Sequence, residues 1–307
     1  MRPRIALCLL AAAFAAPASA DDCRLTQVAS LDATWTPSGD FVVPISIEGK
    51  TKMVTIDVAG FKSGLRVSTI AELGLKHTAM NPNYRIQMVT NEAVTYEALA
   101  EPVGLGGLGI HRMKFLAAPD DTFPTGVDGT VSMDILGNYD VEIDPAHMKV
   151  NLFAQDHCPG QVVYWTKAPA AAIVMRSTEW EHTLFMADLD SHPVTTSLDT
   201  TSARSYVVYH QAAPVFGWKS GGDPVPNEAL PGDTGDYSPL FKHLILNGVD
   251  ITNPKIVIQK FPEGYTTGET IPLWLGMNIL RKFRLFLSSK DHMIYLTAAN
   301  APPADKP

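Results

Sequence analysis

The sequence predicts an all-β protein that contains one β-rich unit twice, together with a few short helices. The first observation is an internal repeat, because residues 45–57 align without gaps on residues 187–199, 142 positions later. The second is that short runs rich in Val, Ile, Phe and Leu alternate with polar residues and are separated by Gly, Pro, Asn and Asp, a pattern typical of strands and turns. The third is that no helical pattern is long. A registered repeat of this kind indicates a duplicated fold.

The first twenty residues have the pattern of a secretory signal peptide. Arg2 and Arg4 give a positively charged start, residues 5–16 are apolar, and residues 18–20 form a cleavage site of small side chains. The apolar run is too short for a stable membrane span. We therefore expect residues 1–20 to be removed and the mature chain to be exported, to the periplasm or outside the cell, without membrane insertion.

The mature chain is acidic. Loss of Arg2 and Arg4 changes the formal charge from −8 to −10. Nucleic acids and anionic membranes attract basic surfaces, so we expect neither as a partner. Two cysteines remain, Cys23 and Cys158, and in an oxidising compartment an even pair is expected to form a disulfide.

The repeat also sets the expected domain limits. We place lobe 1 at residues 35–156 and lobe 2 at residues 171–298, with a turn-rich linker at 157–170 between them. Residues 299–307 contain three prolines and are expected to be a disordered tail.

Strands and helices follow from the local pattern. Alternating hydrophobic runs predict strands at 41–47, 141–144 and 244–249. Short helices are predicted after Met133 and after Met277.

A further short helix is predicted at 68–73. Ser68 or Thr69 is the expected N-cap, and Gly74 is the expected stop. The repeat predicts a counterpart of this helix near 208–213.

Each copy of the repeat ends a strand with an aspartate, Asp57 in the first copy and Asp199 in the second. A serine follows six residues later in both copies, as Ser63 and Ser205, and an apolar residue follows after eight. We expect the two serine hydroxyls to stabilise the aspartate turns. Two such carboxylates suggest a site at which a pair of acids works together.

A second motif recurs downstream, at residues 131–136 and 275–280, with Asp-to-Met spacings of 76 and 78 residues. Together the two motifs resemble those of the retropepsin/pepsin family of aspartic peptidases, in which an apolar strand runs into Asp-Thr/Ser-Gly and an apolar-Gly-Met-Asp-x-Leu run follows. The resemblance covers both copies and most of the mature chain. It implies two retropepsin-like β-barrel lobes related by pseudo-twofold symmetry.

The resemblance implies that Asp57 and Asp199 form a catalytic dyad, within hydrogen-bond or one-water reach of each other. Two carboxylates about 3 Å apart cannot both ionise and so share one proton, which lets one act as general base on a water and the other as general acid. A chain with two copies can complete this site as a monomer. The implied function is an exported aspartic endopeptidase acting on peptides or proteins, with no cofactor and no metal.

The aspartate motifs differ from the family pattern at several residues. Thr200 carries the hydroxyl that braces the two loops, but Val58 does not. Ala59 and Thr201 replace glycine, and the β-branched Thr201 is expected to resist unusual backbone angles. Ser132 replaces the glycine of the second motif.

Three alternatives therefore stay open beside the peptidase. The chain is a non-catalytic protein that still binds peptides, a relic whose aspartates bond only their own turns, or a β-barrel carrier of small ligands. Asp233-Thr234-Gly235 spells the family triplet, but it lies only 44 residues before Met277 and follows Pro231-Gly232, so we interpret it as a loop turn. The nine histidines show no metal-ligand spacing.

Overall fold

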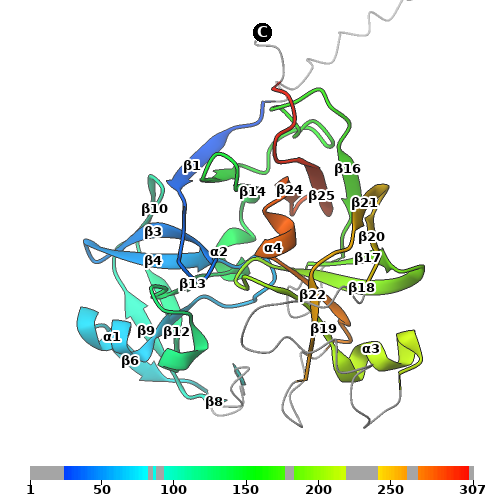
Figure 1. Ribbon diagram of the computed structural model, residues 1–307. Helices are drawn as coiled ribbons and strands as arrows, with labels where there is room; N and C mark the ends of the chain where they lie inside the picture. Colours follow the sequence, from blue (N-terminus) through cyan, green and yellow to red (C-terminus); the bar gives the residue numbers. More distant parts are fainter. Residues whose placement is uncertain are drawn as a thin grey trace, which may run out of the picture.

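The strands form three main sheets, two of which repeat one strand order, as the computed structural model shows (Figure 1). The structure describes residues 24–81, 86–87, 93–176, 183–218, 241–260 and 269–303. The predicted all-β class with a few short helices is confirmed. The two lobes lie side by side, and the third sheet runs across both of them (Figure 1).

Lobe 1 is a ten-stranded sheet with the order β11-β10-β3-β4-β13-β5-β12-β9-β6, to which β2 is added beside β3. Its strands are β2 (Thr34–Trp35), β3 (Phe41–Ile47), β4 (Lys50–Ile56), β5 (Gly64–Arg66), β6 (Lys76–Ala79), β9 (Tyr96–Ala100), β10 (Val103–Leu105), β11 (Leu108–Ile110), β12 (Met113–Ala118) and β13 (Gly129–Val131). A separate two-stranded sheet joins β7 (Ile86–Gln87) to β8 (Ala93–Val94).

Lobe 2 is a seven-stranded sheet with the order β21-β20-β17-β18-β23-β19-β22. Its strands are β17 (Leu184–Leu189), β18 (His192–Asp199), β19 (Ser205–Val208), β20 (His243–Leu246), β21 (Val249–Thr252), β22 (Ile256–Gln259) and β23 (Leu273–Gly276). This is the order of the first seven strands of lobe 1, with each strand replaced by its counterpart in the repeat. The sequence repeat is therefore a repeat of structure.

The hairpin that leads into each aspartate has the same turn in both lobes. Glu48 and Gly49 have φ angles of 49° and 80°, and Asp190 and Ser191 have φ angles of 50° and 65°. Two-residue turns with positive φ at both positions match the natural twist of paired strands. The strands before Asp57 and Asp199 therefore start from equivalent turns.

The third sheet joins the lobes, and its strand order is symmetric about the central pair of strands. Its order is β1-β15-β14-β24-β25-β16, built from β1 (Gln27–Asp32), β14 (Asp140–Asp144), β15 (Lys149–Phe153), β16 (Ala171–Val174), β24 (Phe283–Ser288) and β25 (Met293–Ala298). The central pair is antiparallel, with Glu142 opposite Phe286. The pseudo-twofold axis passes between these two strands, because β14 and β24 are counterparts in the repeat.

The two faces of this sheet differ. Val141, Ile143, Leu285 and Leu287 are buried in the main hydrophobic cluster, which contains residues of both lobes. Alternate residues of a strand point to opposite faces, so Glu142 and Arg284 lie on the other face.

The expected linker, residues 157–170, covers that second face. The buried Glu142 carboxylate accepts hydrogen bonds from Arg284 Nε (2.7 Å) and from the Tyr164 hydroxyl (2.9 Å). The Arg284 guanidinium also lies 4.6 Å from the centre of the Trp165 ring. Within the segment expected to be a disordered tail, the Pro302 carbonyl accepts a hydrogen bond from Thr166 (2.6 Å), so the described tail residues are held against the linker.

Helix α1 (Val67–Leu73) ends at Gly74 as predicted, with a left-handed φ of 67°. Its expected N-cap is wrong, since the helix starts at Val67 and neither Ser68 nor Thr69 caps it. The Ser68 N–H is instead bonded by the carboxylate of Asp120 (3.0 Å), which lies 52 residues away. A distant carboxylate has taken the place of a local hydroxyl.

The other helices are short and come in matched positions. α2 (Met133–Leu136) follows β13 and α4 (Met277–Leu280) follows β23, as predicted. α3 (Tyr209–Phe216) is the counterpart of α1, and a 3₁₀ turn spans Asp120–Thr122. α1 and α3 lie at the lower outer parts of the two lobes, and α2 and α4 lie near the midline (Figure 1). Among the described helices, none combines the length and the apolar character needed to cross a membrane.

Candidate active site

Asp57 and Asp199 occupy equivalent places in the two lobes. Asp57 directly follows β4, and Asp199 is the last residue of β18. Each of these strands runs parallel to a buried partner, β13 in lobe 1 and β23 in lobe 2. Asp57 and Asp199 are half-buried residues, and the strands that carry them are fixed in the core.

The Asp57 carboxylate accepts three hydrogen bonds from its own lobe. Oδ1 accepts from the N–H groups of Ala59 (3.1 Å) and Gly60 (2.8 Å). Oδ2 accepts from the hydroxyl of Ser132 (3.3 Å). A Cβ at position 60 would collide with the carboxylate, so only glycine allows the backbone to approach this closely.

The Asp199 carboxylate is also bonded through both oxygens. Oδ1 accepts from the N–H (3.2 Å) and from the hydroxyl (2.8 Å) of Thr201. Oδ2 accepts from the phenol of Tyr206 (3.0 Å).

Hydroxyl groups of lobe 2 hold the loop that follows Asp57. The Thr200 hydroxyl accepts from the Val58 N–H (3.3 Å) and donates to the carbonyl of Ile56. The Thr183 hydroxyl donates to the Val58 carbonyl (2.6 Å). Both backbone groups of Val58 are therefore bonded by side chains of the other lobe.

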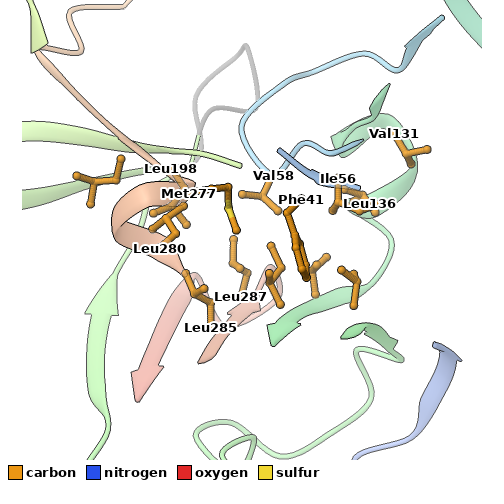
Figure 2. Close-up of a cluster of buried hydrophobic side chains, with 14 of the residues drawn as sticks. Phe41, Ile56, Val58, Val131, Leu136, Leu198, Met277, Leu280, Leu285 and Leu287 are labelled. Carbon is orange, nitrogen blue, oxygen red and sulfur yellow. The ribbon is translucent and has the colours of Figure 1, made fainter. Parts of the chain in front are cut away.

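The Val58 side chain points into the apolar core. It is fully buried and lies among Met277, Phe41 and Ile56 in a cluster drawn from both lobes (Figure 2). Lobe 1 therefore provides packing at this position where lobe 2 provides the hydroxyl of Thr200.

Burial raises the pKa of both carboxyl groups. The pKa of Asp57 is raised to about 6, first because burial disfavours the anion and then because of the negative charge of Asp199; the N–H groups of Ala59 and Gly60 oppose the rise. Burial also raises the pKa of Asp199, against the hydrogen bonds from Thr201 and Tyr206. The two groups thus interact electrostatically, and both have environments that favour retention of a proton.

The serines that follow the aspartates bond the second motif of their own lobe. The Ser63 hydroxyl donates to Asp134 (2.6 Å) and the Ser205 hydroxyl donates to Asn278 (2.7 Å). Each hydroxyl also accepts from a backbone N–H of that motif, Ser132 (2.9 Å) or Gly276 (2.8 Å). Each serine therefore ties the strand after the aspartate to the start of helix α2 or α4.

The backbone strain expected at Thr201 is also absent. The non-glycine residues with positive φ include neither Thr201 nor Ala59. A β-branched residue is therefore tolerated, and its hydroxyl contributes one of the bonds to Asp199.

The remaining expectations concern sulfur and metals. Cys158 is disulfide-bonded. Its expected partner Cys23 and the Asp233–Gly235 triplet lie outside the described residues, so the Cys23–Cys158 pairing and the loop turn stay predictions. Within the described ranges, no group of three or more His, Cys, Asp or Glu side chains could hold a metal ion.

Four residues at the site were missed as positive contributors: Gly60, Ser132, Thr183 and Tyr206. Gly60 follows the altered triplet and was detectable, because the glycine of the motif stands one position later. Ser132 was noted only as a departure from the family pattern. Thr183 and Tyr206 carry no signal in the sequence, since their roles depend on how the two lobes pack around them.

Comparison with known proteins supports the fold alone. No family profile matches the sequence, and no curated protein matches it. The structure is similar to the crystal structure of basic 7S globulin from soybean, with a TM-score of 0.53 and 10% identity, over 91% of this chain and 96% of that chain. At this identity the likeness concerns the overall architecture.

Proposed function

We propose that this protein is an exported aspartic endopeptidase whose dyad is Asp57 and Asp199. The observation that carries the proposal is that two carboxyl groups on equivalent loops both have raised pKa values, and that the charge of Asp199 contributes to the rise in the pKa of Asp57. Strongly perturbed pKa values are typical of functional sites. The hydrogen bonds between the two loops support close placement of the carboxyl groups.

The reaction follows from one shared proton. The ionised carboxylate takes a proton from a water while the water oxygen attacks the scissile carbonyl carbon, and the protonated carboxyl gives its proton to the carbonyl oxygen. Collapse of the tetrahedral intermediate breaks the C–N bond and passes a proton to the leaving nitrogen. No cofactor or metal takes part in these steps, and a single chain supplies both acids, so we expect a monomer to be active.

The pH dependence follows from the same pair. Activity requires one proton, which is lost as the pH rises through the upper pKa of the pair. Because the pKa of Asp57 is raised to about 6, we expect activity to extend into weakly acidic solution and to fall above about pH 6.

The test is cleavage of a diverse peptide library, read by mass spectrometry between pH 4 and pH 8. Asp57→Asn and Asp199→Asn are each expected to abolish cleavage and leave the protein folded. Asp233→Asn, which alters an Asp-Thr-Gly triplet outside the proposed dyad, is the matched control and is expected to cleave normally. Undiminished hydrolysis by either dyad variant would disprove the peptidase assignment.

A second candidate is a peptide-binding protein without catalysis. It is favoured by Val58, which supplies no hydroxyl to the brace between the loops. The discriminating probe is a peptide with a secondary alcohol in place of the scissile carbonyl, which imitates the tetrahedral intermediate. A peptidase binds it more tightly than the parent peptide, whereas a simple binding protein binds both alike and cleaves neither.

A further inference from the structure

The third hydrogen bond to each carboxylate comes from a different place in the two lobes. In lobe 1 it comes from Ser132, just before α2, and in lobe 2 it comes from Tyr206 on β19. The repeat makes Gly276 the counterpart of Ser132, and Gly64 the counterpart of Tyr206. Each lobe therefore has a glycine where the other lobe has its hydroxyl donor.

The lack of a hydroxyl donor at position 276 of lobe 2 has a steric cause. A Cβ at Gly276 would collide with the carbonyl oxygen of Arg204, so no serine can occupy the place that Ser132 has in lobe 1. Ser132, by contrast, is fully buried and its hydroxyl reaches Asp57 Oδ2. A donor for Asp199 Oδ2 has to come from another strand, and Tyr206 provides it.

The Tyr206 ring is held by packing. It is stacked on Trp274, with ring centres 6.1 Å apart and an angle of 12° between the planes. The Trp274 indole is itself fixed by a hydrogen bond to the carbonyl of Ile271 (3.1 Å). Both rings belong to a small apolar cluster that also includes Ala59, from the loop that carries Asp57. The phenol is thus aimed at Asp199 by a rigid support.

We propose that Ser132 and Tyr206 are positioning residues that do the same work from non-equivalent positions, each orienting Oδ2 of its aspartate for the shared-proton reaction. This proposal rests on the proposed function. A hydroxyl that donates to a carboxylate fixes the plane of the group and favours its ionised form. Two matched donors keep the dyad nearly symmetrical although the lobes differ in sequence.

The first test is kinetic. Tyr206→Phe keeps the ring on Trp274 and removes only the phenol, and Ser132→Ala removes only the hydroxyl. Loss of one hydrogen bond to a charged group corresponds to a fall in kcat of about 10- to 100-fold, with little change in KM. The charge of Asp199 acts on Asp57, and each donor favours the ionised form of its own aspartate, so each variant is also expected to move one limb of the pH–rate profile to higher pH.

The matched control is Tyr164→Phe. It also removes a phenol that donates to a buried carboxylate, that of Glu142 (2.9 Å), but in the sheet between the lobes. We expect it to lower stability without moving either limb of the profile. A Tyr206→Phe variant with wild-type kcat and an unmoved profile would overturn the proposal and leave the peptidase assignment intact.

The second test does not need catalysis. The melting temperatures of wild type, Tyr206→Phe and Ser132→Ala are compared at pH 4 and pH 8. Because the donors act on the ionised carboxylates, the variants should lose stability at pH 8 and lose much less at pH 4. If the wild type cleaves no peptide but this difference is present, the proposed function fails and the positioning role stands. An equal loss at both pH values overturns the positioning role.

Discussion

Val58 combines two roles that are usually divided between residues. Its side chain is fully buried in the apolar core, while its N–H and its carbonyl are bonded by the hydroxyls of Thr200 and Thr183. The brace between the loops is therefore one-sided, because lobe 2 supplies both hydroxyls. A side chain that cannot form hydrogen bonds is accommodated where its backbone is held by its partner.

Val58→Thr is expected to increase peptidase activity. By the symmetry of the lobes, a hydroxyl at this position points toward the backbone of the Asp199 loop and completes the reciprocal brace. A new buried hydroxyl is nearly neutral for stability when it finds a partner, within about 1 kcal/mol. Measurement of kcat/KM and of the urea midpoint tests this, with Val58→Ala as the control that loses packing and adds no donor. Reduced activity in the threonine variant would contradict the prediction.

Asp57→Asn is expected to stabilise the protein in a pH-dependent way. A carboxyl whose pKa rises from 3.8 to about 6 on folding contributes stability below pH 3.8 that is lost as the pH rises through 6, up to about 3 kcal/mol. Asparagine has the same shape and carries no charge, so the variant should exceed the wild type in free energy of unfolding at pH 7.5 and match it near pH 4. Calorimetry at the two pH values provides the measurement.

The exposed Asp32 gives a control for that experiment, since its side chain is 84% exposed and pairs with Lys149 at the surface. Asp32→Asn should show no comparable difference between the two pH values. An equal shift for Asp57→Asn at both pH values would show that the Asp57 carboxyl has an ordinary pKa.

At the scale of elements, the hairpins and short helices could be predicted because their signals are local. Gly74 ends α1 where expected, and the repeat placed the strands before both aspartates correctly. The N-cap of α1 could not be predicted, because the Ser68 N–H at the start of the helix donates to Asp120, which lies in a distant loop. The sheet between the lobes was missed for the same reason, since its central pair joins residues 141–143 to residues 285–287.

The candidate active site divides in the same way, into residues with a local signal in the sequence and residues placed by distant contacts. Asp57 and Asp199 could be located from the repeat, because each stands at the end of a strand at the same position of its copy. Ser132 lies 75 residues from the aspartate that it serves, and Tyr206 acts from a strand whose facing is set by packing on Trp274. Such contacts depend on the assembled lobes and leave no pattern in a short window of sequence.

A buried pair attaches the linker to β14, with His157 from the linker bonded to Asp140 from the strand. His157 bonds Asp140 through Nε2 and the carbonyl of Cys158 through Nδ1 (3.0 Å). Burial alone would lower the pKa of His157, but the Cys158 carbonyl and the Asp140 carboxylate more than offset it and raise the pKa. Both ring nitrogens face acceptors, so the pair holds a proton.

His157→Gln is expected to destabilise the protein by about 3–5 kcal/mol, because the buried Asp140 carboxylate loses its protonated partner. A histidine with a raised folded pKa contributes stability that is complete below pH 6.5 and is lost as the pH rises through that pKa. The cost should therefore be larger at pH 6 than at pH 9 in urea unfolding. The double variant with Asp140→Asn should recover much of the loss, whereas an equal cost at both pH values would contradict the assigned protonation.

At the scale of the whole molecule, a continuous sheet and a common core join the lobes. The covalent linker between the lobes contributes less to holding them together. The main hydrophobic cluster includes Val58 and Leu136 of lobe 1 together with Leu198 and Leu280 of lobe 2 (Figure 2). The β14–β24 pair adds backbone hydrogen bonds across the same boundary.

Cleavage within the linker should therefore leave the halves together. A site-specific protease sequence inserted between Gly160 and Gln161, both exposed, allows the chain to be cut after folding. The expected Cys23–Cys158 bond lies within the first fragment and does not join the two. We expect size-exclusion chromatography to give one species before and after cutting. Separation into two smaller species would show that the sheet between the lobes is too weak to hold them.

The pairing of Glu142 with Phe286 has a consequence for the ancestry of the chain. Residue 142 and residue 286 are counterparts, so this is the place where a symmetrical dimer of one half would set a residue against its own copy. Two first halves would put two buried glutamates face to face, which like-charge repulsion opposes. Such a dimer is therefore disfavoured at this position, and the fused chain avoids the repulsion because Phe286 lies opposite Glu142.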